Sequence, residues 1–274
     1  MSVRIGSIEI APLLDAVGTL AELEQAYPDV EAQEWAPYRA LYPELHAGSR
    51  WRLPVKVHVI RSGGTTVLAD TGVGPPGSFP MWRGDREGLL PAALEELGVQ
   101  RDAVDLVFLT HLHIDHIGWT TDERADVLFP NARYLVHREA LGFARTNPDR
   151  PHIRRCVEPL VGRFELLDAD AELAPGVTAF SAPGHYPGHM GVRIRSNGDE
   201  AVLIADIAPH PALLDRPEWV YAFDDAPQTT TRAELIAELL DRDVLAICGH
   251  YPGSGVGHVV TRDGRVVWEE SPNG

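Results

Sequence analysis

Residues 111–116 read His-Leu-His-Ile-Asp-His, which places four ligand-type side chains within six positions. They follow a largely apolar run, 104–109, that predicts a buried strand. The first two histidines alternate with apolar neighbours, so an extended or tightly turned backbone points both the same way, and the aspartate and last histidine leave on the opposite side of the turn. Neutral imidazole nitrogens and carboxylate oxygens are ligands that zinc and its neighbours prefer. The spacing therefore predicts two adjacent metal ions. The alternative is a run of polar residues at a strand end that form hydrogen bonds with the backbone, but such residues would not need four ligand-type side chains at this spacing.

Three later segments carry the same kinds of side chain. They are Ala-Pro-Gly-His-Tyr-Pro-Gly-His at 182–189, Leu-Ile-Ala-Asp at 203–206 and Ile-Cys-Gly-His at 247–250. Together with the cluster at 111–116, they resemble the signatures of the metallo-β-lactamase-fold hydrolases, and the resemblance runs from about residue 51 to about residue 265. It implies an α/β fold, a four-layer αββα sandwich with the site at its rim, formed as a single domain over residues 1–274.

The resemblance also implies a ligand set and a mechanism. The first metal ion would bind His111, His113 and His185, the second would bind Asp115, His116 and His250, and Asp206 would bridge the two ions. Zinc is the expected metal, with manganese, iron and cobalt as alternatives. A metal-bridging hydroxide would attack the substrate carbonyl, and Asp115 would shuttle the proton. Asp70 is expected to accept a hydrogen bond from the free nitrogen of a ligating histidine, His111.

Two segments narrow the resemblance to the branch that contains quorum-quenching lactonases and methyl-parathion hydrolase. They are residues 219–225 and the glycine-rich residues 251–258. We therefore expect a lactonase, with aryl esterase, phosphotriesterase and thioesterase activities as alternatives on the same site. The sequence continues only from His250 to Gly274 after the last expected ligand, so we expect no extra helical domain of the kind with which glyoxalase II binds glutathione, and that thioesterase is disfavoured.

Two positions depart from the pattern of that branch. Many of its lactonases have a tyrosine three residues after the bridging aspartate, where this chain has Pro209, and glycine is usual where this chain has Ala205. The residue that helps to stabilise the oxyanion is therefore expected to be His210, Tyr251 or Tyr186.

Charge and composition restrict the partners. The net charge is −16, and a surface of this sign repels nucleic-acid phosphates and anionic membranes, which disfavours a nuclease and favours a small ester or lactone substrate. A metal-dependent redox enzyme is the other alternative, disfavoured by the complete ligand set and the lack of a flavin domain. The sequence shows no apolar run of about 18 residues and no signal-peptide core, and it contains two cysteines, so we expect a cytoplasmic protein.

Residues 19–52 interrupt the strand pattern. Apolar and aromatic residues recur there roughly as one helical face, broken by prolines, at Leu20, Leu23, Tyr27, Trp35, Tyr38, Leu41 and Tyr42. This insertion is expected either to form a lid or wall beside the substrate or to pack on the core or on a second subunit of a homodimer.

The remaining pattern predicts a strand over 3–13, a hairpin of strands 55–61 and 65–69, and a short helix over 89–98. A capping box at Thr231–Glu234 predicts the start of a further helix.

Overall fold

The computed structural model describes residues 2–19, 21–79, 82–222, 224, 226–242 and 244–272. Leu20 of the expected helical face, and Phe223 and Asp225 of the segment 219–225, lie outside the described residues.

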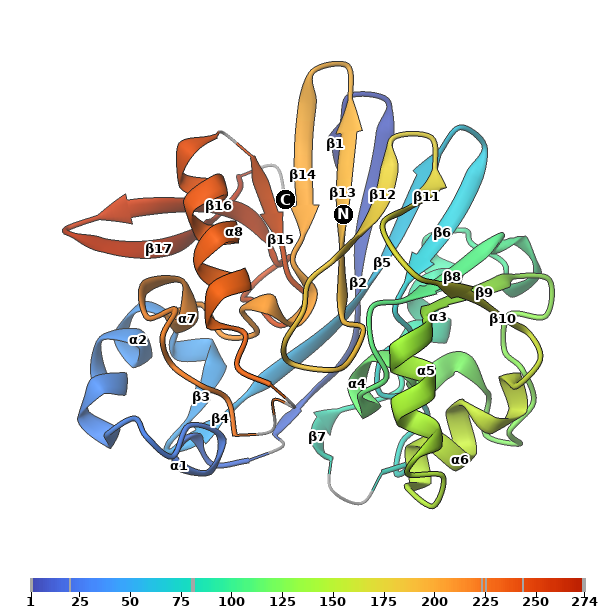
Figure 1. Cartoon of the computed structure of the whole chain (residues 1–274), viewed down its shortest axis with the longest axis horizontal. Coiled ribbons are helices and arrows are strands. Elements are labelled where there is room, and N and C mark those ends of the chain that lie inside the picture. Colours follow the sequence, from blue (N-terminus) through green and yellow to red (C-terminus); the bar gives the residue numbers. More distant parts are fainter. Residues whose placement is uncertain are drawn as a thin grey trace.

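Two sheets form the centre of the described structure (Figure 1). Within the described ranges, the first sheet has eight strands in the order β1-β2-β5-β6-β8-β9-β10, with β7 paired to β2. Their bounds are β1 Val3–Ile5, β2 Ile8–Thr19, β5 Leu53–Ser62, β6 Thr65–Ala69, β7 Arg83–Arg86, β8 Leu106–Leu109, β9 Arg133–His137 and β10 Phe164–Leu167. The second sheet has the order β11-β12-β13-β14-β15-β16-β17. Its strands are β11 Ala171–Ala174, β12 Val177–Ser181, β13 Met190–Ser196, β14 Asp199–Leu203, β15 Leu245–Ile247, β16 Val256–Arg262 and β17 Arg265–Glu270.

Helices cover the outer face of each sheet, so the layers run helix, sheet, sheet, helix (Figure 1). Helices α3 (Leu90–Glu96), α5 (Arg138–Arg145) and α6 (Pro151–Cys156) lie on the side of the first sheet, and α7 (Ala212–Asp215) and α8 (Thr229–Asp241) lie on the side of the second. Short 3₁₀ turns are η1 Ala32–Trp35, η2 Pro43–Leu45, η3 Arg101–Ala103, η4 Gly118–Thr120, η5 Glu158–Leu160 and η6 Ala205–Ile207. The predicted four-layer αββα sandwich is confirmed.

The core between the sheets is built from alternate residues of their strands. Ile60 of β5, Phe108 of β8 and Val192 of β13 belong to this buried cluster, whereas Val57 and Val59 of β5 belong to a second cluster with the outer helices. Because side chains alternate along a strand, β5 presents its even-numbered residues to the second sheet and its odd-numbered residues to the outside.

Two predicted elements differ from the structure. The strand expected over 3–13 is two antiparallel strands, β1 and β2, because Gly6 turns the chain with a φ of 55°. The capping box expected at Thr231 is wrong, since α8 begins at Thr229 and the Thr231 hydroxyl donates to the Pro183 carbonyl at 2.8 Å. The predicted hairpin and the helix over 89–98 are present as β5–β6 and α3.

The segment between β2 and β5 holds α1 (Leu23–Ala26), α2 (Ala36–Leu41) and the small hairpin β3 (His46–Ala47) and β4 (Arg50–Trp51). Its aromatic side chains pack on the second half of the same chain. The Tyr38 hydroxyl donates to Asp215 Oδ2 at 2.6 Å, and the ring of Trp35 lies 4.9 Å from that of Trp219. Within the described residues, no helix combines the length and the apolar character needed to cross a membrane.

Candidate metal centre

The ligand-type residues stand where strands of both sheets end. The cluster 111–116 follows β8 and overlaps the one-turn helix α4 (Ile114–Ile117). His185 lies between β12 and β13, Asp206 lies in η6 after β14, and His250 follows β15. Two residues here have a left-handed backbone conformation, with φ of 37° at His185 and 45° at Ala205. The conformation of Ala205 gives a physical reason why glycine would be favoured before the bridging aspartate.

The first group of ligand atoms comes from His111, His113, His185 and Asp206, and all lie within 4.8 Å of one another. His113 Nδ1 is 3.0 Å from His111 Nε2 and 3.0 Å from His185 Nε2. Asp206 Oδ2 is 3.2 Å from His185 Nε2.

The second group comes from Asp115, His116 and His250, which also lie within 4.8 Å of one another. The Nε2 atoms of the two histidines are 3.4 Å apart, and Asp115 Oδ2 is 3.8 Å from the first and 3.7 Å from the second. Asp206 Oδ1 lies 3.2 Å from His250 Nε2 and 3.5 Å from His116 Nε2. The carboxylate of Asp206 therefore directs one oxygen to each group.

These residues fit two divalent metal ions. Separations of 3.0–3.8 Å between ligand atoms bracket the edge of about 3.3 Å expected for a tetrahedron with zinc–ligand bonds of about 2.0–2.1 Å. Asp206 Oδ1 is buried and has no hydrogen-bond partner in the described chain. Burial lowers the pKa of His111 and of His113 well below the usual value, which keeps both imidazoles in the neutral form that binds metals.

Hydrogen bonds on the far side of three rings fix their orientation. Nδ1–H of His116 donates to Asp70 Oδ2 at 2.8 Å, that of His185 donates to Asp224 Oδ1 at 2.6 Å, and that of His250 donates to the Pro54 carbonyl at 2.8 Å. Each bond keeps the proton on Nδ1 and so leaves Nε2, which faces the ligand groups, free to bind a metal ion. Asp224 lies in the segment 219–225 that supported the resemblance, but the sequence indicated no role for it.

The expectation that Asp70 holds His111 is wrong, since its partner among the ligands is His116. The reason is the path of the backbone after α4, where the amide of Thr71 donates to the His116 carbonyl at 2.7 Å and brings that residue beside the end of β6. Nδ1 of His111 instead lies 3.1 Å from the Thr110 hydroxyl.

The expected oxyanion residues lie in different surroundings. His210 is buried among aromatic rings, with its ring centroid 5.2 Å from Trp35 and 5.6 Å from Trp51. The Tyr251 ring is also buried and lies 5.4 Å from that of Trp268.

Tyr186, the third expected oxyanion residue, and Tyr221 have their rings next to those of the ligands. The ring of Tyr186 is 4.9 Å from that of His113, and the ring of Tyr221 stacks on that of His185 at 6.0 Å and 20°. The sequence named Tyr186 as a candidate but not Tyr221, which lies 15 positions after the bridging aspartate. The catalytic roles assigned to Asp115, Asp206, His210 and Tyr251 stay predictions.

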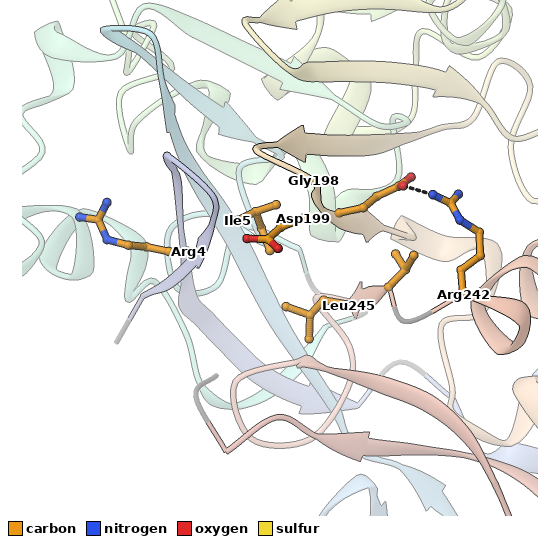
Figure 2. A pocket seen from close by; sticks show the side chains of 8 residues that line it. Arg4, Ile5, Gly198, Asp199, Arg242 and Leu245 are labelled. Atoms are coloured by element: carbon orange, nitrogen blue, oxygen red, sulfur yellow. Dashed lines mark hydrogen bonds and ion pairs between the residues drawn. The ribbon is translucent and has the colours of Figure 1, made fainter.

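A cavity of about 480 Å³ lies away from the ligands, at the opposite end of β14 (Figure 2). Arg4, Asp199, Glu200, Arg242 and Leu245 are among its lining residues, and Glu200 pairs with Arg242. It has no histidine in its lining and is separate from the candidate metal centre.

Comparisons with known proteins agree with this arrangement. N-acyl homoserine lactonase AiiB of Agrobacterium fabrum (strain C58 / ATCC 33970) is 29% identical over 187 residues, which cover 58% of this chain and 64% of that protein. An N-acyl homoserine lactonase of Bacillus thuringiensis is 26% identical over 179 residues, which cover 58% of this chain and 66% of that protein. The chain thus spans less than two thirds of the length of these curated relatives.

Solved structures match over nearly the whole chain. AidC, a dizinc quorum-quenching lactonase in complex with a product, has a TM-score of 0.84 and 21% identity, covering 99% of this chain and 97% of that chain. The hydrolase AbOPH of the beta lactamase superfamily has a TM-score of 0.81 and 24% identity, covering 98% of this chain and 96% of that chain. At these identities the likeness shows the fold alone. The family model of the metallo-beta-lactamase superfamily matches residues 50–250, a range that contains all seven candidate ligands, and the chain therefore belongs to the metallo-β-lactamase superfamily.

Proposed function

We propose that the protein is a metal-dependent hydrolase of lactones, with two divalent metal ions, zinc first, and an N-acyl homoserine lactone as the first substrate to test. The observation that carries this proposal is the carboxylate of Asp206, which directs Oδ2 to one complete ligand group and Oδ1 to the other. The names of the relatives support the choice of substrate.

The chain's own residues have distinct roles in this proposal. When bound, two divalent ions would supply Lewis acidity and would lower the pKa of a coordinated water towards 7. Asp115 is the proposed proton carrier, because its carboxylate lies beside both histidines of the second group and can accept a proton at one oxygen and pass it to a leaving alkoxide. His189 positions Asp206, since its Nε2 accepts a hydrogen bond from the Asp206 amide at 3.2 Å.

The rings next to the ligands suit a neutral substrate with an apolar part. Beyond Tyr221, which stacks on His185, lie Tyr27 at 5.4 Å and Trp51 at 6.1 Å between ring centroids. We define these three residues as the aromatic wall, and we propose that the segment 19–52 thereby helps to form the substrate site. Tyr27 and Trp51 are buried and support Tyr221, which is partly exposed, so Tyr221 is the member of the wall that can offer apolar area to an acyl chain.

The test combines metal content with a substrate panel on the same purified sample. The panel contains N-acyl homoserine lactones of several chain lengths, simple γ- and δ-lactones, an aryl ester, a thioester and a phosphotriester. Two metal ions per chain and a kcat/KM that is highest for a lactone are expected. One ion or none, or iron with oxygen consumption and no hydrolysis, would contradict the proposal, and faster turnover of another ester would move the assignment to that class.

Two variants connect the activity to the site. Asp206→Ala removes the carboxylate shared by the two groups and is expected to abolish turnover and lower the metal content. Asp199→Ala removes a carboxylate at the other end of β14, beside the remote cavity. This variant should keep the wild-type turnover and metal content.

A further inference from the structure

The only lysine of the chain, Lys56, is buried. It lies in β5 on the even-numbered face, the face on which Ile60 packs in the core between the two sheets. A charged ammonium group at such a position costs free energy unless its donors find partners. Lys56 must therefore be explained by what it contacts.

The partners of Lys56 are backbone carbonyls of one loop. Its Nζ donates to the Tyr251 carbonyl at 2.6 Å and to the Gly249 carbonyl at 3.4 Å, and its own amide donates to the Gly249 carbonyl at 3.2 Å. Among the residues that the structure describes, no carboxylate lies within ion-pair distance of Lys56. The direct partners of the ammonium group are therefore the loop carbonyls, and the carboxylate of Glu270 acts on it only from a greater distance.

The two carbonyls belong to the residues on either side of His250. The same strand holds the imidazole itself, since the Pro54 carbonyl accepts from His250 Nδ1–H at 2.8 Å. Two neighbouring even-numbered residues of β5 thus fix both the backbone and the ring of this ligand, although the ligand belongs to the other sheet.

We infer that Lys56 is a positioning residue for the second metal site. It holds the loop 249–251 so that His250 Nε2 faces Asp115 and Asp206. The inference rests on the two-metal centre of the proposed function, and it adds a residue outside the seven candidate ligands.

The space around the ammonium group explains why a lysine stands here. A Cβ on Gly255 would lie 3.6 Å from Nζ, an ordinary contact distance, so this part of the loop also lies against the ammonium group. A compact ammonium on a flexible stem fits such a place, whereas the planar guanidinium of arginine needs more room. Burial lowers the pKa of Lys56 to about 8, so the group still carries its proton at pH 7.

The first experiment measures the affinities of both metal sites in Lys56→Met, by competition with a chelator. We expect the second ion to bind about 10-fold to 100-fold more weakly and the first ion to bind with its wild-type affinity. The matched control is Ser62→Ala, which removes a side-chain hydrogen bond to a carbonyl, that of Pro175, at the other end of β5. Its two affinities should equal those of the wild type.

The outcomes separate this inference from the proposed function. A wild-type protein that binds fewer than two ions would contradict the proposed function. A wild type with two ions, together with a Lys56→Met variant that has a lower melting temperature but two unchanged metal affinities, would overturn the positioning role alone.

A second experiment needs no variant, because Lys56 is the only lysine. The wild-type protein is treated with an amine-acylating reagent, and modification of Lys56 is followed by mass spectrometry relative to the α-amino group. We expect acylation of Lys56 to be at least several-fold slower in the metal-loaded protein than in the metal-free protein, because a bound ion holds the loop over the ammonium closed. Equal rates in the two forms would overturn the inference.

Discussion

Asp70 accepts a hydrogen bond from Nδ1 of His116 at 2.8 Å, between residues 46 positions apart in the sequence. The same carboxylate accepts from the amide of Thr110 at 2.8 Å, at the end of β8. One side chain therefore ties the strand that precedes the ligand cluster to the last ligand of that cluster.

Replacement of Asp70 by asparagine is expected to weaken the second metal site. The φ of residue 70 is 63°, a conformation that asparagine tolerates, so the variant should fold. It loses the charge that orients and polarises His116, and we expect an affinity about 10-fold to 100-fold lower for the second ion, measured by chelator competition. Asp263→Asn, at another left-handed position far from the ligands, is the control. An unchanged second affinity in Asp70→Asn would contradict this role.

Asp224→Asn should affect the first metal site instead. Asp224 accepts from Nδ1 of His185 at 2.6 Å, and both side chains are only 2% exposed. The loss of this bond leaves the ring free to take the wrong tautomer, so the affinity for the first ion should fall about 10-fold or more. Measurements on Asp70→Asn and Asp224→Asn under the same conditions should show opposite site preferences, and the same loss at both sites in both variants would argue against separate roles.

Replacement of Asp15 by alanine is expected to lower the stability of the fold. This buried carboxylate accepts from the amides of Val73 at 2.7 Å and Leu90 at 2.9 Å, and from Trp119 Nε1 at 2.8 Å. Asp15→Ala leaves these donors unsatisfied at about 1–3 kcal/mol each, so the free energy of unfolding should fall by at least about 3 kcal/mol. Urea unfolding measures this loss. Asp105→Ala removes an exposed carboxylate bonded to one amide, that of Thr66, and a loss of similar size there would refute the explanation.

The fold and the full ligand set followed from the resemblance to the metallo-β-lactamase-fold hydrolases, whereas the cluster at 111–116 could be predicted from a local pattern. Apolar runs predict strands, and ligand-type side chains directly after them must meet wherever those strands end at one rim, as His111 and Asp206 do. The break between β1 and β2 was missed because a single glycine, Gly6, turns an otherwise continuous apolar alternation.

The contacts that orient the ligands could not be predicted in the same way. The partner of Asp70 depends on how the chain returns from α4, and Asp224 meets His185 only through the long connection between β14 and α8. The burial of His210 follows from the packing of Trp35 and Trp51, which come from a segment whose position no sequence pattern specified. Such contacts are set by tertiary packing, which leaves no periodic trace in the sequence.

His58 is expected to make the folded protein less stable in acid. Burial, with the nearby cationic charges, lowers the pKa of His58 to about 3 from an ordinary 6.5. Below pH 6.5 the unfolded chain takes up a proton at this residue and the folded chain does not, so stability is lost as the pH falls from 6.5 towards 3. One such group accounts for about 2 kcal/mol between pH 7 and pH 5.

His58→Leu removes this contribution. The difference in unfolding free energy between pH 7 and pH 5, measured with urea on metal-free protein in the presence of a chelator, should shrink by about 2 kcal/mol whatever the absolute stability of the variant. Ser62→Ala, on the same strand and without a titratable group, should keep the wild-type difference. If His58→Leu keeps it as well, then His58 is not the residue that makes the folded protein sensitive to acid in this range.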